Sequence, residues 1–119
     1  MATFSSKRIE KPMARPNPEY QLTEAADQDL LAIARYTIRK WGVEQARRYE
    51  AILEDCFSAI AKGKIRPRVF LKRRPELLFT HCEHHYVFYV IKDDGWPLVI
   101  AVLHENMNLV ARLKQRFSE

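Results

Sequence analysis

The sequence has few of the residues that mark several common protein classes. Its 119 residues include two cysteines, Cys56 and Cys82, and three glycines. Two cysteines are too few for a disulfide scaffold, and without a Cys-x-x-Cys pair they give no sign of a zinc site. Gly42, Gly63 and Gly95 stand far apart, so there is no glycine-rich loop to hold a phosphate group. A disulfide-rich domain and a phosphate-loop enzyme are therefore excluded.

Long apolar runs are also absent. No segment approaches the ~20 consecutive apolar residues that a membrane-spanning helix needs. The basic N-terminal residues are not followed by an apolar block, so no secretory signal is expected. A hydrophobic content of 47% is nevertheless ample for one core. We expect a small, soluble, cytoplasmic protein with no membrane partner and no cofactor.

No acidic residue lies between Lys62 and Pro75, and the net charge of +5 belongs entirely to the second half of the chain. Residues 1–61 carry nine Lys or Arg and nine Asp or Glu, whereas residues 62–119 carry eleven against six. This imbalance favours an acidic protein or a nucleic acid as partner over a solvated loop and strand edge. Because Phe70 is the one aromatic residue within the stretch, base stacking is not supported. The basic stretch comprises Lys62, Lys64, Arg66, Arg68, Lys72, Arg73 and Arg74.

The N-terminal residues differ in composition from the rest. Residues 1–18 hold Pro12, Pro16 and Pro18 and show little apolar periodicity. Proline removes backbone donors and disfavours the helical region for the residue before it. We therefore expect a flexible basic arm over residues 1–18 and one folded domain over residues 19–119.

The first part of that domain predicts a strand and two helices. Glu19–Leu22 alternates as a strand does, and Thr23 is a suitable N-cap for a helix over Glu24–Trp41. Gly42 ends this helix, and a second amphipathic helix follows over Val43–Lys62. So short a connection requires the two helices to lie antiparallel as a hairpin.

The second part predicts a β-meander and a last helix. Asp93-Asp94-Gly95 is a turn signal between two apolar runs. Asn108 is placed to cap a helix over Leu109–Phe117, with Val110 and Leu113 on its apolar side. The fold class is thus α+β, with the helices packed on one face of the sheet: an N-terminal strand, an antiparallel helical hairpin packed on an antiparallel β-meander, and a short C-terminal helix. The expected strands of the meander are Val69–Leu71, Leu77–Cys82, His85–Lys92 and Pro97–His104.

Aromatic residues of the helices have two interpretations. Tyr36, Trp41 and Tyr49 could form a recognition surface, but their helical spacing with Ile33 and Leu53 favours packing between the two helices. We therefore expect all three in the core.

A run of titratable residues suggests metal binding at first sight. It reads His81-Cys82-Glu83-His84-His85, and each of these side chains can ligate zinc. Successive side chains on a strand or tight turn point in opposite directions, so the five cannot converge on one ion. We expect ordinary surface histidines and no metal.

Several short motifs, in order, resemble ParE-type toxins of the RelE/ParE superfamily. The similarity extends over about residues 19–114. The sequence departs from the family pattern at Glu76-Leu77-Leu78, where Gly-Leu-Arg is usual, at His81, where relatives have Arg, and at Asn108, where they have Asp. The matching segments are Leu22-Thr23-Glu24-Ala25-Ala26, Asp29-Leu30, Ile33, Tyr36-Thr37, Trp41-Gly42, Gln45-Ala46, Tyr49, His85-Tyr86-Val87-Phe88-Tyr89, Val102-Leu103-His104-Glu105-Asn106-Met107-Asn108 and Arg112-Leu113.

The resemblance implies the toxin of a type II toxin–antitoxin pair, neutralised by a cognate antitoxin. ParE members poison DNA gyrase by binding, which would make this chain a non-enzyme. The alternative is a ribosome-dependent mRNA endoribonuclease of RelE type, with His104 as acid or base and Arg112 stabilising the phosphate. RelE-type nucleases also use a tyrosine near the C-terminus, whereas the last tyrosine here is Tyr89. The docking interpretation is therefore preferred, and His104 is expected to be a structural, hydrogen-bonded residue at a strand end. The residues expected to bind the target or the antitoxin are Arg66, Arg68, Lys72, Arg73, Arg74, Arg112, Lys114 and Arg116.

Overall fold

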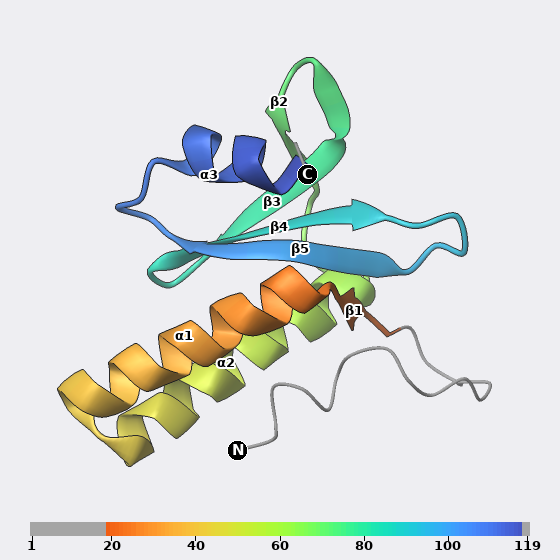
Figure 1. Cartoon of the computed structure of the whole chain (residues 1–119). Coiled ribbons are helices and arrows are strands. Elements are labelled where there is room, and N and C mark those ends of the chain that lie inside the picture. The colour runs from red at the N-terminus through yellow and green to blue at the C-terminus, as the bar shows by residue number, and fades with distance from the viewer. Residues whose placement is uncertain (1–18, 118–119) are drawn as a thin grey trace.

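The computed structural model describes residues 19–117 (Figure 1). The predicted α+β class is confirmed, and the expected N-terminal arm lies outside the described residues. The elements are β1 (Gln21–Leu22), α1 (Glu24–Trp41), α2 (Val43–Ala61), β2 (Arg68–Leu71), β3 (Arg74–Cys82), β4 (His85–Ile91), β5 (Pro97–His104) and α3 (Leu109–Phe117).

The helical hairpin has the predicted form. The Thr23 hydroxyl accepts a hydrogen bond from the Ala26 N–H at 3.0 Å, which satisfies one of the unpaired donors at the start of α1. Gly42 ends α1 with φ +98°, a conformation that residues with a Cβ rarely adopt. Its N–H donates to the Ile38 carbonyl, and α2 begins at the next residue. The chain therefore reverses within one residue, and α2 ends at Ala61, one residue earlier than predicted.

The strands form one sheet in the order β1-β5-β4-β3-β2. Strands β2 to β5 are an antiparallel meander, as predicted, while β1 pairs with β5 in parallel, so the whole sheet is mixed. Parallel neighbours cannot be joined by a tight turn, and here the helical hairpin and strands β2 to β4 separate β1 from β5 along the chain. Strand β3 starts at Arg74 rather than Leu77, because Arg74 pairs with Leu71 across a tight turn.

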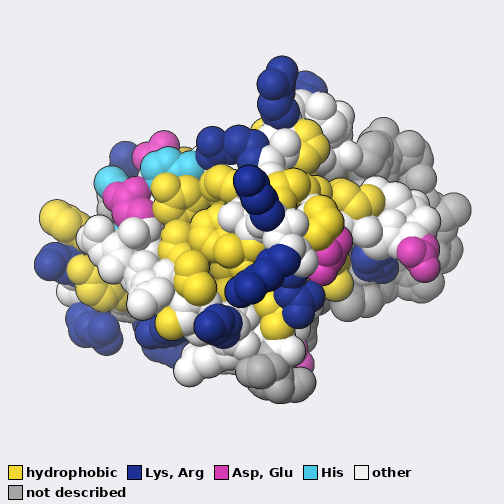
Figure 2. Space-filling view, turned by 90° about the horizontal axis from the view of Figure 1, so that it is seen from above, with side chains coloured by type: hydrophobic (Ala, Val, Ile, Leu, Met, Phe, Trp, Pro, Cys, Tyr) yellow, Lys and Arg dark blue, Asp and Glu magenta, His cyan; other side chains and the backbone are white. Residues whose placement is uncertain are grey.

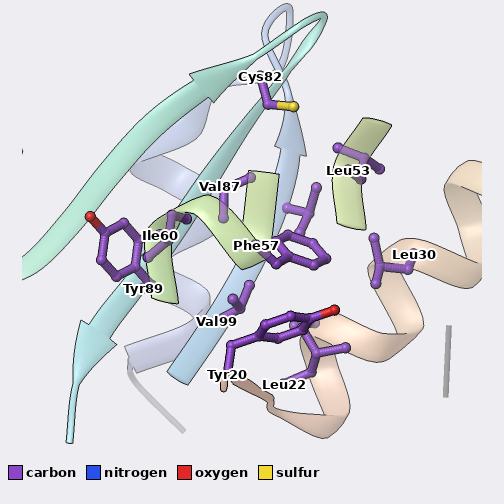
Figure 3. Close-up of a cluster of buried hydrophobic side chains, with 12 residues drawn as sticks. Tyr20, Leu22, Leu30, Leu53, Phe57, Ile60, Cys82, Val87, Tyr89 and Val99 are labelled. Carbon is purple, nitrogen blue, oxygen red and sulfur yellow. The ribbon is translucent and has the colours of Figure 1, made fainter. Parts of the chain in front are cut away.

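Apolar side chains cover both faces of the sheet, which corrects the expectation that all helices lie on one face. In β4, Val87 and Tyr89 point to the hairpin, and Tyr86 and Phe88 point to α3. A strand that is apolar on both sides needs cover on both sides, so α3 packs opposite the hairpin (Figure 1). Figure 3 shows the core on the hairpin side, which includes Tyr20, Leu22, Leu30, Leu53, Phe57, Ile60, Cys82, Val87, Tyr89 and Val99.

The prediction that Tyr36 and Trp41 are core residues is wrong. Tyr36 is 52% exposed and Trp41 is 65% exposed, whereas Tyr49 does pack against the core. The hairpin extends past the sheet at its turn, so nothing in the sheet lies beneath its end (Figure 1). Helical spacing indicates the side of a helix that faces the core, but it does not indicate how far the core extends.

Candidate functional site: a basic face and a histidine corner

Two basic segments that are far apart in the sequence meet on the sheet face that carries α3. The Arg74 guanidinium carbon, at the start of β3, lies 4.2 Å from the centre of the Phe117 ring in α3. The Arg68 guanidinium carbon in β2 lies 4.5 Å from the centre of the Phe79 ring. Both are cation–π contacts. We call this surface, together with the cations next to it in the chain, the basic face. Its aromatic residues are Phe70, Phe79, Tyr86 and Phe117, and its cations are Arg66, Arg68, Lys72, Arg73, Arg74 and Lys114.

A row of aromatic rings from three neighbouring strands forms the middle of the basic face. The centre of the Phe70 ring lies 5.3 Å from that of Phe79 and 5.0 Å from that of Phe88, both edge to face. The ring centres of Phe79 and Tyr86 are 5.9 Å apart, and His81 stacks on Tyr86 at 4.6 Å. A count of aromatic residues along the chain does not reveal this row, because its members come from three different strands. The alternation of Tyr86 and Phe88 in β4 was the available signal.

Figure 2 looks onto this face of the molecule. Apolar side chains form a continuous area in its middle, and Lys and Arg side chains stand along and around that area. Phe70, Phe79 and Tyr86 are partly buried, so each of these residues retains some exposed surface. The surface can therefore combine apolar contact with ion pairing to an acidic partner.

Helix α3 divides the predicted binding residues between its two sides. Consecutive residues of a helix are about 100° apart, so Lys114 lies on the side of Phe117, toward β3. Arg112 lies on the opposite side with Arg116. The buried stripe of α3 includes Leu113 and Arg116, whereas Val110 is exposed, contrary to prediction. Of the predicted residues, Arg66, Arg68, Lys72, Arg73, Arg112 and Lys114 are exposed, and Arg74 is half-buried and pairs with Glu76 at 3.2 Å.

Arg116 is held within the protein at the edge of strand β5. Its guanidinium forms a two-pronged ion pair with Asp29 of α1, with N–O distances of 2.8 and 3.1 Å, and donates to the Ile100 carbonyl at 2.7 Å. Asp29 also accepts a hydrogen bond from the Val102 N–H at 2.9 Å. Strand β1 pairs with β5 only as far as Val99. Beyond the end of β1, the ion pair therefore supplies hydrogen-bond partners to the backbone of β5, and it joins α1, β5 and α3.

All four histidines of the chain lie together at the other end of the sheet, where β4 begins and β5 ends. His81 and His84 both contact the Glu105 carboxylate, at 2.9 and 3.4 Å. The rings of His85 and His104 meet edge to face with centres 5.1 Å apart. We call His81, His84, His85, His104 and Glu105 the histidine corner. Contact with both imidazoles holds the pKa of the Glu105 carboxyl below its usual value.

Tyr49 of α2 ties the histidine corner to the helical hairpin. Its hydroxyl oxygen accepts a hydrogen bond from the His84 N–H at 3.1 Å and lies 2.7 Å from Nδ1 of His85. The hydroxyl hydrogen therefore points to Nδ1 of a neutral His85 ring. Burial, followed by the nearby His104, lowers the pKa of His85 to about 4, and burial raises the pKa of Tyr49 to about 12. Both groups are thus uncharged at neutral pH.

His104 occupies the strand end that the sequence predicted. Its Nδ1 accepts a hydrogen bond from the Asn106 N–H at 3.0 Å, as a structural role requires. Among residues 19–117, no three His, Cys, Asp or Glu side chains are grouped so that they could hold a metal ion. In the same range no helix has the length and apolar content that crossing a bilayer would take.

Comparison with known proteins identifies the family of this chain. A sequence profile described as "ParE toxin of type II toxin-antitoxin system, parDE" matches residues 20–109, from the start of the sheet to the first residue of α3. This chain belongs to the ParE toxin family. The predicted resemblance is thereby confirmed, and the chain is a toxin of a type II toxin–antitoxin system.

Individual relatives agree with the ParE assignment. Toxin ParE of Escherichia coli is 43% identical over 97 residues, which are 82% of this chain and 94% of that protein. Toxin ParE1 of Mycobacterium tuberculosis H37Rv is 31% identical over 93 residues, covering 76% and 92%. A solved chain titled "Chromosomal ParDE TA system from P. aeruginosa" has a TM-score of 0.60, covering 70% of this chain and 90% of its own length. At 15% identity this last match shows the fold alone.

The pH dependence of stability in this ParE toxin is expected to report on His85. In the unfolded chain His85 has an ordinary pKa of 6.5, and in the native state it has a pKa of about 4. Between these pH values the unfolded state binds a proton that the native state does not, so acidification favours unfolding. The free energy of unfolding should therefore fall by about 1–3 kcal/mol as the pH is lowered from 6.5 toward 4. Above pH 6.5 His85 is neutral in both states, and its stabilising effect is complete.

Urea denaturation of the wild type and of His85→Gln at pH 7, 5.5 and 4.5 would measure this effect. Glutamine can still contact the Tyr49 hydroxyl but does not titrate, so its free energy of unfolding should change less over this range. Parallel curves for the two proteins would contradict the assignment to His85.

Proposed function

We propose that this ParE-family chain acts by binding and inhibiting its target, that the target is DNA gyrase, and that a cognate antitoxin neutralises it. Gyrase inhibition would place its action in the cytoplasm. The composition of the basic face supports the part of this proposal that the chain works through protein partners. Exposed cations stand around partly exposed aromatic rings, and this pairing is typical of protein-binding surfaces.

The basic face is the proposed binding surface for the antitoxin. Its residues match an acidic segment with apolar side chains, which would lie over Phe70, Phe79 and Tyr86 and pair with Arg68 and Arg73. The similar chain from P. aeruginosa is titled as part of a ParDE toxin–antitoxin system, which supports a protein partner of this kind. Arg112, on the far side of α3, would extend the contact around the helix.

The alternative remains a ribosome-dependent mRNA endoribonuclease. It would use His104 as the proton-transferring group and Arg112 as the phosphate-stabilising cation. His104 already uses Nδ1 to accept the Asn106 N–H, which leaves Nε2 as its donor. This hydrogen bond favours the structural role and thus the docking mechanism.

Two assays run in parallel would separate the alternatives. Purified toxin is added to a gyrase supercoiling reaction and to translating ribosomes with a defined mRNA. Inhibition of supercoiling without mRNA cleavage is the expected result. Cleavage of mRNA with supercoiling unaffected would overturn the proposal in favour of the nuclease.

Replacing His104 with Gln is expected to keep most of the toxic effect. Glutamine can still accept a hydrogen bond at the strand end, but it does not transfer a proton near neutral pH. Growth arrest after induced expression measures the effect, and circular dichroism of the purified variant controls for folding. A loss of roughly 10²- to 10⁴-fold in a folded variant is what removal of an acid or base catalyst produces, and it would refute docking.

A further inference from the structure

The turn of the helical hairpin carries an exposed apolar patch that does not pack in the core of the fold. Tyr36 and Trp41 at the end of α1 and Val43 at the start of α2 are each more than half exposed. We call these three residues the hairpin tip. Exposed aromatic and aliphatic residues that are adjacent, rather than scattered, mark interaction surfaces.

The hairpin tip is strongly basic. Residues 35–48 contain five cations and a single acid, Glu44. Lys40 lies over the tip itself, with its Nζ 5.9 Å from the ring centres of both Tyr36 and Trp41. These contacts hold a cation beside the apolar patch. The five cations, all exposed, are Arg35, Arg39, Lys40, Arg47 and Arg48.

The shape of the tip indicates what kind of partner it fits. Two antiparallel helices project past the sheet and end in a one-residue turn, so the tip is convex (Figure 1). An extended or helical peptide needs a groove or a sheet edge to lie on. A projecting tryptophan with cations around it instead suits insertion into a concave site of a folded protein, and Trp, Tyr and Arg are the residues that dominate binding energy at interfaces.

We propose that the hairpin tip inserts into an apolar site with an acidic rim on the folded target protein of this toxin. Trp41 is the central anchor, Tyr36 and Val43 flank it, and Arg39 and Lys40 pair with the acidic rim. This inference rests on the proposed function, in which the toxin acts by docking. It assigns target binding to the hairpin and leaves the basic face to the antitoxin.

The test compares Trp41→Ser with a matched control, Ile91→Ser. Both remove an exposed apolar side chain, but Ile91 lies at the end of β4, away from the hairpin turn. A second tip variant, Arg39→Glu with Lys40→Glu, keeps the apolar patch and reverses the charge. Growth arrest in cells, inhibition of purified gyrase and affinity for the cognate antitoxin are measured for each, with circular dichroism as a check on folding.

Both tip variants are expected to need roughly tenfold or more protein for growth arrest and gyrase inhibition. Their antitoxin affinity should stay within about twofold of the wild type, and Ile91→Ser should match the wild type throughout. Unchanged growth arrest by folded tip variants would overturn the proposal. So would a loss of antitoxin binding, or a wild-type dimer in sedimentation velocity that the tip variants abolish.

Failure of the proposed target is distinguishable from failure of the tip. If the wild type arrests growth without inhibiting gyrase, the gyrase assignment is wrong. Growth arrest then still reports on the tip, because it responds to whichever protein the toxin binds. Loss of arrest in the two tip variants alone would support the tip with another target, and retention would refute it.

Discussion

Replacing Asp29 with Ala should cost this protein about 2–4 kcal/mol of its free energy of unfolding. The substitution removes the carboxylate from the Arg116 guanidinium, whose side chain is 24% exposed. It also leaves the Val102 N–H without its acceptor. Breaking a largely buried ion pair from one side is costly because the remaining charge stays buried and unpaired.

The chain offers a matched control for this prediction. Arg74 and Glu76 also form an Arg–carboxylate pair, but their side chains are 43% and 55% exposed. Replacing Glu76 with Ala should therefore cost well under about 1 kcal/mol. Thermal and urea unfolding of the two variants measure the difference. Similar losses would mean that the β5 edge does not depend on the ion pair.

The Asp29–Arg116 pair also shows where sequence patterns stop being informative. Capping residues and apolar periodicity are local, and they placed α1 and α3 at their observed bounds. The same local reasoning predicted Arg116 to be a binding residue and did not predict a partner for Asp29. The two residues are 87 positions apart, and only the packing of α1 and α3 around the end of β1 brings them together.

The basic face could be predicted only in part, because composition along the chain is also a local property. An excess of cations over residues 62–75 is visible in composition, so most members of the predicted set are exposed as expected. The aromatic row beneath them depends on strand order, because it joins Phe70 of β2 with Phe79 of β3 and Tyr86 of β4. Composition along the chain does not reveal this neighbourhood, but alternation on adjacent strands does once their pairing is known.

Reversal of two charges on the basic face is expected to weaken antitoxin binding by about 100-fold or more at physiological salt, which is about 2.7 kcal/mol. The variant is Arg68→Glu with Arg73→Glu. Arg68 stands over the Phe79 ring, so its reversal places a carboxylate beside the aromatic row and an acidic partner. Like charges brought together at an interface oppose binding, which adds to the loss of the original pairs.

The matched control is Arg35→Glu with Arg47→Glu, which changes the net charge equally but on the hairpin. Calorimetry should show antitoxin binding close to that of the wild type for this control. A similar loss in both double variants would mean that overall charge, rather than the basic face, determines affinity. Circular dichroism is needed for both, because Arg68 also packs on an aromatic ring.

Salt then separates the apolar part of the contact from the electrostatic part. Raising salt from 0.15 to 1 M shortens the screening length from about 8 to about 3 Å, so exposed ion pairs contribute little. Contacts of the antitoxin with Phe70, Phe79 and Tyr86 do not depend on charge, and apolar association persists at high salt. The wild-type complex should therefore weaken but remain measurable at 1 M salt. Complete loss of binding at moderate salt would show that the cations act alone, and that the exposed aromatic row has no part in holding the antitoxin.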